Sequence, residues 1–244
     1  MKSLAIIPAR FASTRFPGKP LADIEGKPMI QHVYERTEQA TLVDSVIVAT
    51  DDERIAQAVR QFGGKVEMTA TTHQSGTDRC AEVAQRHTAF DCIVNVQGDE
   101  PFIQPEQIDQ VLRPFTHVGT TTCISTLAKK IEERAQLLRP SVVKVVFDTH
   151  YNALYFSRNA IPYLRDVAVG NWLQQADFYK HIGIYAFRRD ILQEVANLAP
   201  TRLERLEKLE QLRWLAHGYP ITVTLTQWES RGIDTPGDLE QLSQ

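Results

Sequence analysis

The chain has 244 residues, of which 43% are hydrophobic and 23% are charged, with 27 basic against 30 acidic side chains. This composition is typical of one globular domain, and the slightly acidic balance argues against nucleic acid as a partner. The three cysteines lack CxxC spacing, and no apolar run has the length of a signal-peptide core or a membrane span. We therefore expect a cytoplasmic protein without membrane insertion.

Strands alternate with helices in the first half of the chain. Apolar runs predict strands at residues 4–7, 45–49, 66–68 and 92–96. Helical spacing of apolar residues predicts the intervening helices at residues 29–38, 55–62, 77–87 and 105–115. Several of the strands show no polar alternation, which is typical of a sheet buried on both faces. The pattern predicts an α/β fold with a Rossmann-like, mainly parallel sheet and helices on both faces.

Strand-like runs lie closer together in the second half, at residues 120–127, 142–147, 153–156, 182–187 and 221–225. Between two of them, residues 161–180 carry aromatic side chains but little periodicity. We expect this segment to reach a partner subunit. An equal alternative is that it forms a surface loop that covers its own core. One long helix is expected over residues 201–217, and a last one near residues 236–242.

Three cations follow the first strand, in a loop that contains Arg10, Ser13, Arg15 and Lys19. Open α/β sheets bind ligands beyond the carboxyl ends of their strands, so this position favours phosphate binding. The alternative is that these are ordinary solvated cations. Pro20 stands where a Walker motif has Ser or Thr, and no GxG pair occurs, so P-loop and NAD chemistry are disfavoured.

Two aspartates are candidate metal ligands. Asp99 follows the strand at residues 92–96, and Gly98 beside it leaves room for a ligand. A carboxylate near a triphosphate suits Mg²⁺, although Asp99 as a plain cap or turn residue is an equal alternative. Asp234, just before Pro236, is by its local pattern an N-cap. The segment with Ser75 opens a helix, where amides can approach a ligand.

Several of these segments resemble the motifs of one sugar nucleotidyltransferase family. They are IPAR and PGK within residues 7–19, HQSGTDR at 73–79, QGDEP at 97–101 and GIDT at 232–235. Each is similar to a motif of the 3-deoxy-manno-octulosonate (KDO) cytidylyltransferases, and they follow one another in the same order along nearly the whole chain.

The resemblance implies a fold of the nucleotide-diphospho-sugar transferase type with a smaller sugar-binding and dimerisation lobe. It implies one catalytic domain, residues 1–244, with nucleotide binding mainly in 1–125 and sugar binding and dimer contacts mainly in 126–244. The implied reaction transfers CMP from CTP to KDO with release of pyrophosphate, for bacterial lipopolysaccharide biosynthesis. The implied cofactor is Mg²⁺, and the implied assembly is a homodimer.

The resemblance also implies roles for individual residues. Catalytic roles fall to Arg10, Lys19 and Asp99, and metal binding to Asp99 and Asp234. The implied nucleotide contacts are Ala9, Arg10, Ser13, Arg15, Lys19, Ser75, Gly76 and Arg79. The implied sugar contacts are Gln97, Arg158, His181, Tyr185, Glu210 and Gln211.

Without the resemblance, the sugar candidates have plainer interpretations. Arg158 reads as a surface cation, His181 and Tyr185 as half-buried polar residues, and Glu210 with its neighbour as a solvated helix face. Lys144, in another matching segment, receives no role from the sequence. Two further functions stay open: transfer to a related sugar acid, such as 8-amino-KDO or a sialic acid, and nucleotide binding by a regulator without catalysis.

Overall fold

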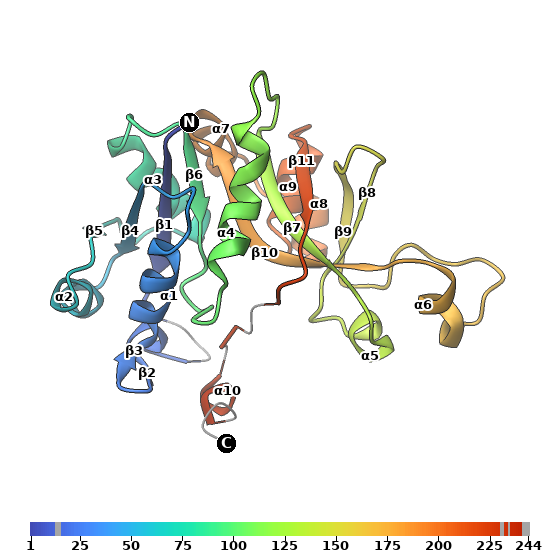
Figure 1. Ribbon diagram of the computed structural model, residues 1–244, viewed down its shortest axis with the longest axis horizontal. Helices are drawn as coiled ribbons and strands as arrows, with labels where there is room; N and C mark the ends of the chain where they lie inside the picture. The colour runs from blue at the N-terminus through green and yellow to red at the C-terminus, as the bar shows by residue number, and fades with distance from the viewer. Residues whose placement is uncertain (13–15, 230–231, 234, 241–244) are drawn as a thin grey trace.

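A nine-stranded sheet organises the computed structural model, which describes residues 1–12, 16–229, 232–233 and 235–240. Its main path runs in the order β11-β7-β10-β6-β1-β4-β5, and β8 and β9 extend it beside β10 (Figure 1). The strands are β1 (Ser3–Ala9), β4 (Ser45–Thr50), β5 (Val66–Met68), β6 (Cys92–Asn95), β7 (Ile124–Lys130), β8 (Lys144–Phe147), β9 (Ala153–Ser157), β10 (Tyr179–Arg188) and β11 (Ile221–Leu225). A separate hairpin joins β2 (Asp23–Ile24) and β3 (Lys27–Pro28).

The sheet is mainly parallel, as predicted. β1 runs parallel to β4 and β6, β4 to β5, and β7 to β11, whereas β10 lies antiparallel between β6 and β7. Leu4 and Ile7 of β1 have no exposed surface, because this strand is covered on both faces. Because β1, β4, β5 and β6 run in the same direction, their carboxyl ends meet at one edge of the sheet. Ligands bind at this edge in folds of this kind.

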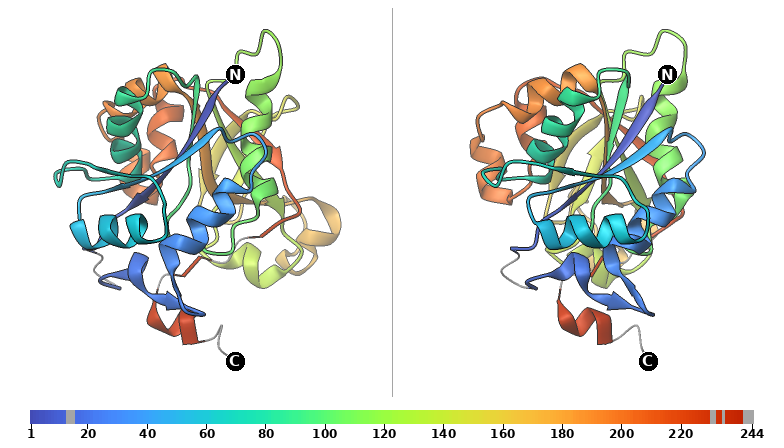
Figure 2. Two further views of the ribbon diagram at one scale, coloured as in Figure 1. Left: turned by 60° about the vertical axis from the view of Figure 1, so that its left-hand side comes forward. Right: turned by 90° about the vertical axis from the view of Figure 1, so that its left-hand side faces the viewer.

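Helices cover both faces of the sheet (Figure 2). One core contains Ile30 of α1, Val59 of α2 and Val111 of α4; the core on the opposite face contains Val83 of α3 and Leu192 of α7. The helices are α1 (Met29–Glu38), α2 (Glu53–Gln61), α3 (Gly76–Arg86), α4 (Pro105–Leu112), α5 (Arg134–Leu138), α6 (Trp172–Gln175), α7 (Arg189–Ala196), α8 (Arg202–Glu207), α9 (Gln211–Ala216) and α10 (Pro236–Glu240), with 3-10 turns η1 (Lys19–Leu21), η2 (Arg113–Thr116) and η3 (Val169–Asn171). Within the described part of the chain, none of them is long and apolar enough to cross a membrane.

Polar residues set where the helices near the ligand-binding edge begin. The Asp52 carboxylate accepts the backbone N–H of Arg54 at 2.9 Å and starts α2. Ser75 and Asp78 form a reciprocal capping box that starts α3. Both helices therefore begin directly beyond the carboxyl ends of the central strands.

The prediction of one long helix over residues 201–217 is wrong. α8 ends at Glu207, Lys208 adopts a left-handed conformation with φ 53°, and α9 begins at Gln211. The leucines at helical spacing do not share one buried face, because Leu206 is 69% exposed whereas Leu209 is 7% exposed. The helices α5 and α7 were also not predicted from the sequence.

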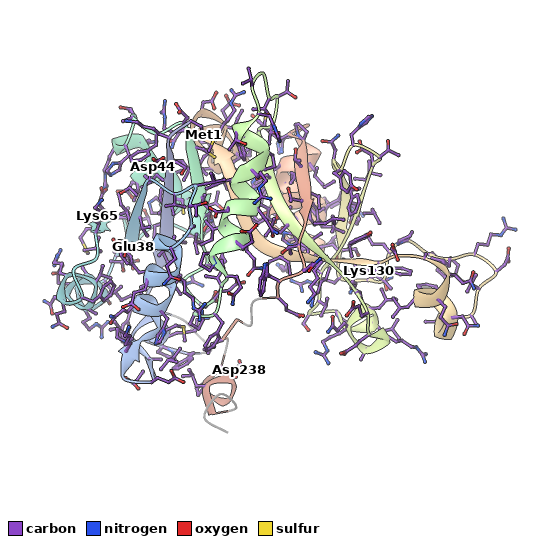
Figure 3. All side chains as sticks on the ribbon, viewed as in Figure 1. Met1, Glu38, Asp44, Lys65, Lys130 and Asp238 are labelled. Atoms are coloured by element: carbon purple, nitrogen blue, oxygen red, sulfur yellow. The ribbon has the colours of Figure 1, made fainter. Side chains whose placement is uncertain are left out.

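Residues 160–178, which we call the arm, project from the sheet between β9 and β10, to the right in Figure 1. Trp172 stacks on Phe178 with ring centroids 5.8 Å apart, and Ile131 and Leu137 complete a small separate core. Lys130, labelled at the end of β7 in Figure 3, pairs with Asp177 near the base of the arm at 2.6 Å. The arm thus shares a small core with the segment of Ile131 and Leu137, and its contact with a partner subunit stays a prediction.

Candidate active site

A pocket of about 260 Å³ lies at the carboxyl ends of β1 and β6. It brings together residues 8–10, 19–20, 73–76, 79 and 97–99, most of which belong to separate motifs of the sequence. Its lining is Pro8, Ala9, Arg10, Lys19, Pro20, His73, Gln74, Ser75, Gly76, Arg79, Gln97, Gly98 and Asp99. Most of the nucleotide candidates therefore share one cavity; Ser13 and Arg15 lie outside the described residues.

Lys19 and Asp99 face each other in this pocket. The Lys19 ammonium donates to Asp99 Oδ2 at 2.7 Å, although the two residues are 80 positions apart. Their side chains are 13% and 36% exposed, so the pair lies toward the solvent side of the pocket. A cation suited to phosphate and a carboxylate suited to a metal thus lie within one hydrogen bond of each other.

The loop that delivers Lys19 is held by Phe11. The Gly18 N–H donates to the Phe11 carbonyl at 2.9 Å, and Gly18 turns the chain with a φ of 73° that a glycine adopts without strain. The Arg54 guanidinium lies 3.3 Å from the centroid of the Phe11 ring and is itself bound by Asp52. The loop is thereby tied to the first turn of α2.

Gly98 lets the acidic turn pass close to β1. A Cβ at this position would lie 2.8 Å from the Pro8 carbonyl oxygen. Real Cβ contacts are longer, so a side chain would force the two backbones apart. The glycine is thus explained by backbone packing, in addition to the room for a ligand that the sequence suggested.

Arg79 forms a buried ion pair at the pocket wall. It is 4% exposed, and its guanidinium donates to Asp51 at 2.9 Å and to the Thr69 hydroxyl. Asp51 follows β4, so the pair joins the carboxyl end of that strand to α3. Asp51 was not predicted as this partner, because it lies 28 positions from Arg79 and no local pattern connects the two residues.

Two other residues of the pocket, His73 and Gln74, were not predicted as ligand contacts. His73 Nε2 lies 2.5 Å from Glu82 Oε2, and the same carboxylate oxygen accepts the Ala70 N–H at 2.9 Å. These contacts hold the loop before Ser75. Both residues belong to the HQSGTDR segment at 73–79, but no role was predicted for either of them.

Glu210 lies beside the nucleotide pocket, contrary to its plain interpretation as part of a solvated helix face. Its carboxylate accepts from the Thr77 hydroxyl at 2.7 Å and from Ser75. Burial raises the Glu210 pKa, although the Thr77 and Ser75 hydroxyls oppose the shift. Its neighbour Gln211 is 5% exposed. The α8–α9 break therefore brings a carboxylate from the second half of the chain to the start of α3.

Tyr185 and His181 of β10 form, together with Glu210, a group that we call the polar cluster. The rings are 5.3 Å apart, and the Tyr185 hydroxyl is buried without a hydrogen-bond partner among the described residues. Burial, together with the negative charge of Glu210, raises the Tyr185 pKa. His181 contacts the Thr126 hydroxyl at 2.9 Å and packs edge-on against Phe156. Burial of the imidazole lowers its pKa to about 3. The imidazole is therefore neutral at physiological pH.

Arg158 is not an exposed surface cation. Its guanidinium donates to the backbone carbonyls of Glu207 at 2.6 Å, Pro140 at 3.2 Å and Lys208 at 3.3 Å. It does not line the pocket of Lys19 and Asp99. Gln97 does line that pocket, and its amide donates to Asn95 Oδ1 at 3.2 Å. The sugar roles of these residues stay predictions.

A second hollow of about 340 Å³ adjoins the acidic turn, with Glu100 in its wall. His181 also lines it, as do Arg139 and the buried Lys180, which pairs with Glu229. Asp99 and Glu100 are consecutive, so the turn separates the two hollows.

The residues present fit a Mg²⁺ ion only in part. Mg²⁺ typically takes one or two protein carboxylates and fills its remaining positions with phosphate oxygens and water. Asp99 offers such a carboxylate at the nucleotide pocket, whereas Asp234 lies outside the described residues. No cluster of three or more acidic, histidine or cysteine ligands occurs in the part of the chain that the structure describes. The described residues thus offer such an ion one carboxylate at the nucleotide pocket, that of Asp99.

A mainly parallel sheet whose strand ends carry a cationic loop, a helix start and a carboxylate turn defines a nucleotidyltransferase. Comparison with known proteins gives the family. The model of the cytidylyltransferase family matches residues 4–223, and the chain belongs to this family, among its 3-deoxy-manno-octulosonate cytidylyltransferases.

Three relatives illustrate the match. The 3-deoxy-manno-octulosonate cytidylyltransferase of Geobacter metallireducens is 55% identical over 99% of this chain and 96% of its own length. That of Pelobacter propionicus is 56% identical over 98% and 95%. A CMP:2-keto-3-deoxy-manno-octonic acid synthetase solved in complex with CTP superposes with a TM-score of 0.91 at 45% identity, covering 99% of this chain and 97% of that one.

Proposed function

We propose that the protein transfers CMP from CTP to KDO, giving CMP-KDO and pyrophosphate. The observation that carries this proposal is the meeting of the family's motifs in one pocket, where Lys19 and Asp99 lie 2.7 Å apart beside Ser75 and Gly76. The whole-length similarity to enzymes named for this reaction supports the choice of nucleotide and sugar.

In the proposed reaction, the anomeric hydroxyl oxygen of KDO attacks the α-phosphorus of CTP. The bond between the α-phosphorus and the bridging oxygen of the leaving group breaks, pyrophosphate departs with that oxygen, and the hydroxyl proton is released to solvent. Arg10 and Lys19 hold the phosphates and stabilise the charge that develops on the leaving group. Ala9, Ser75 and Gly76 hold the nucleoside end, beside the buried Arg79.

Mg²⁺ is the proposed cofactor. Asp99 would hold the ion, and Asp234 is predicted to be its second ligand. When bound, Mg²⁺ offsets the repulsion between two anionic substrates and lowers the pKa of a coordinated oxygen. Lys19, which pairs with Asp99 in this structure, would then turn to the phosphates.

The acidic sugar is proposed to contact Gln97, which lines the nucleotide pocket, and the polar cluster of Tyr185, His181 and Glu210. The Tyr185 hydroxyl, which has no hydrogen-bond partner among the described residues, supports this, because a buried polar atom without a partner is costly unless a ligand uses it. Arg158 and Gln211 are the remaining proposed contacts.

Pyrophosphate release tests the proposal. The protein is incubated with Mg²⁺, with CTP or another nucleoside triphosphate, and with KDO, 8-amino-KDO or a sialic acid. We expect turnover with CTP and KDO that is lost on removal of Mg²⁺ and in Asp99→Asn. Turnover only with another sugar acid would replace KDO as the substrate, and CTP binding without turnover on any sugar would leave a nucleotide-binding regulator.

We further propose that the enzyme acts in the cytoplasm in bacterial lipopolysaccharide biosynthesis. Homodimerisation through residues 126–244, with the arm as a contact, is part of the same proposal. Sedimentation of the intact protein measures its mass in solution, and a monomer at micromolar concentration would contradict the dimer.

A further inference from the structure

The break between α8 and α9 is fastened to the end of β9 by Glu207. Its carboxylate accepts from the Ser157 hydroxyl at 2.7 Å and from the Arg158 backbone N–H at 2.9 Å. One acidic side chain thus ties the last residue of α8 to the strand that precedes the arm.

Arg158 fastens the same break from the other side. Its guanidinium donates to the carbonyls of Glu207 and Lys208, which are among the groups that a helix end leaves without intrahelical partners. Lys208 adopts a left-handed conformation that non-glycine residues rarely take, and such a conformation persists where the surroundings hold it. The break is therefore specified by side chains from outside the helix.

Lys144, for which no role was predicted, lies behind Arg158 and supports the same break. It has no exposed surface, and its ammonium donates to the carbonyls of Arg139 at 3.0 Å, Val142 at 2.6 Å and Arg158 at 2.6 Å. Burial lowers its pKa, whereas the charge of Glu207 opposes that shift. An ammonium has three N–H groups, so Lys144 has none left for a substrate.

The break decides where Glu210 lies. Glu210 follows Lys208 by two residues and reaches Thr77 at the start of α3 at 2.7 Å. A helix continuing through residue 208 would rotate Glu210 away from this position. α8 itself does not require Glu207, because Thr201 caps its start and Glu204 pairs with Arg213.

We propose that Glu207 and Lys144 are positioning residues of the acidic-sugar part of the site. Together with Arg158 they form a clamp that holds the α8–α9 break and so places Glu210 beside the nucleotide pocket. The inference rests on the proposed function, since it assigns the clamp to the sugar side of that reaction.

Steady-state kinetics with varied KDO and varied CTP tests the clamp in Glu207→Ala and Glu207→Gln. We expect the KM for KDO to rise about tenfold in Glu207→Ala, the size expected for lost hydrogen bonds to a charged group, with the KM for CTP unchanged. Glu207→Gln keeps one acceptor oxygen and should show a smaller rise. Lys144→Met should behave like Glu207→Ala; if it does not fold, the Glu207 pair still decides the question.

Asp109→Asn is the matched control for stability. Asp109 is a buried carboxylate that also accepts from a loop, through Thr41 and Leu42, but it lies away from both hollows. The Asp109→Asn substitution should lower the melting temperature and leave the KM values for KDO and CTP unchanged. Glu207 variants that behave like this control, or that raise both KM values alike, would overturn the proposal.

Hydrogen exchange separates failure of the clamp from failure of the proposed function, because it needs no substrate. Amides of residues 208–212 should exchange faster in Glu207→Ala than in the unaltered protein, and those of residues 76–80 should not. Unchanged exchange at 208–212 would overturn the clamp. Faster exchange there in a protein that does not use KDO would keep the clamp and reject its assignment to the sugar.

Discussion

The nucleotide pocket and the polar cluster around Glu210 adjoin at Ser75, but their residues reach this place by different routes. Lys19, Gly76 and Asp99 each lie in a short segment near the carboxyl end of a strand or the start of a helix, so the parallel sheet itself gathers them. Glu210 arrives through a helix break that depends on contacts from Ser157, Arg158 and, behind them, Lys144. The difference teaches that the first half of the site is built by topology and the second by specific side-chain contacts.

The largest expected effect is on the nucleotide side. Lys19→Ala should lower kcat by more than 100-fold, since one electrostatic contact to developing charge contributes about 3 kcal/mol. The melting temperature should hardly change, because the partly exposed pair with Asp99 adds little stability. The control is Lys27→Ala, an exposed lysine that pairs with Glu35 on α1. Full activity in Lys19→Ala would remove this residue from the reaction.

Breaking the ion pair behind the pocket should affect stability as well as binding. Asp51→Ala leaves the buried Arg79 without its carboxylate and should destabilise the fold by about 2 kcal/mol, below the usual range for buried pairs because Asp51 is 19% exposed. Urea unfolding and the KM for CTP measure the two effects. An unchanged KM for CTP would mean that Arg79 serves the fold alone.

On the sugar side, Glu210→Gln should lower activity and raise stability together. The folded-state pKa of Glu210 is raised, so its favourable contribution exists below the unfolded pKa and is lost as pH rises through the folded value. Above the folded-state pKa the buried charge therefore costs stability, and its removal should raise the melting temperature at alkaline pH. We expect a roughly tenfold loss of turnover with KDO. A lower melting temperature at alkaline pH with normal turnover would contradict a role in the site.

The smallest expected effect concerns His181. Its folded pKa of about 3 lies below the usual 6.5, so the stability it contributes is present above pH 6.5 and is lost as pH falls toward 3. Between pH 7 and 5.5 the unaltered protein should lose about 1 kcal/mol that His181→Gln does not lose. Exposed His150, changed to Gln, is the matched control. Identical pH profiles for all three proteins would show that His181 is not held neutral.

Much of the nucleotide pocket could be predicted from local sequence patterns, whereas the candidates of the sugar side were named by resemblance alone. A buried strand followed by cations, a capping motif or an acidic turn is a local pattern. Lys19, Ser75 and Asp99 lie in such patterns, and the structure places all three in one pocket. Asp51 was missed as the partner of Arg79 because the two residues lie 28 positions apart and no local pattern connects them.

The helix prediction over residues 201–217 shows why local patterns were insufficient in the second half. Leucines recur there at helical spacing, yet Leu206 faces solvent and Leu209 the core, so the periodicity does not report the break. The break depends on Ser157 and Arg158, about 50 residues earlier, and no property of the helix segment indicates them.

By itself, the sequence determined the alternating strands and helices, the mainly parallel sheet and the motifs at its carboxyl edge, because burial and capping act over a few neighbouring residues. The tertiary structure alone decided that Lys144 is a buried support, that Arg158 holds backbone carbonyls and that Glu210 stands beside Thr77. Those positions depend on hydrogen bonds between distant segments, which form only where the fold brings the partners within reach.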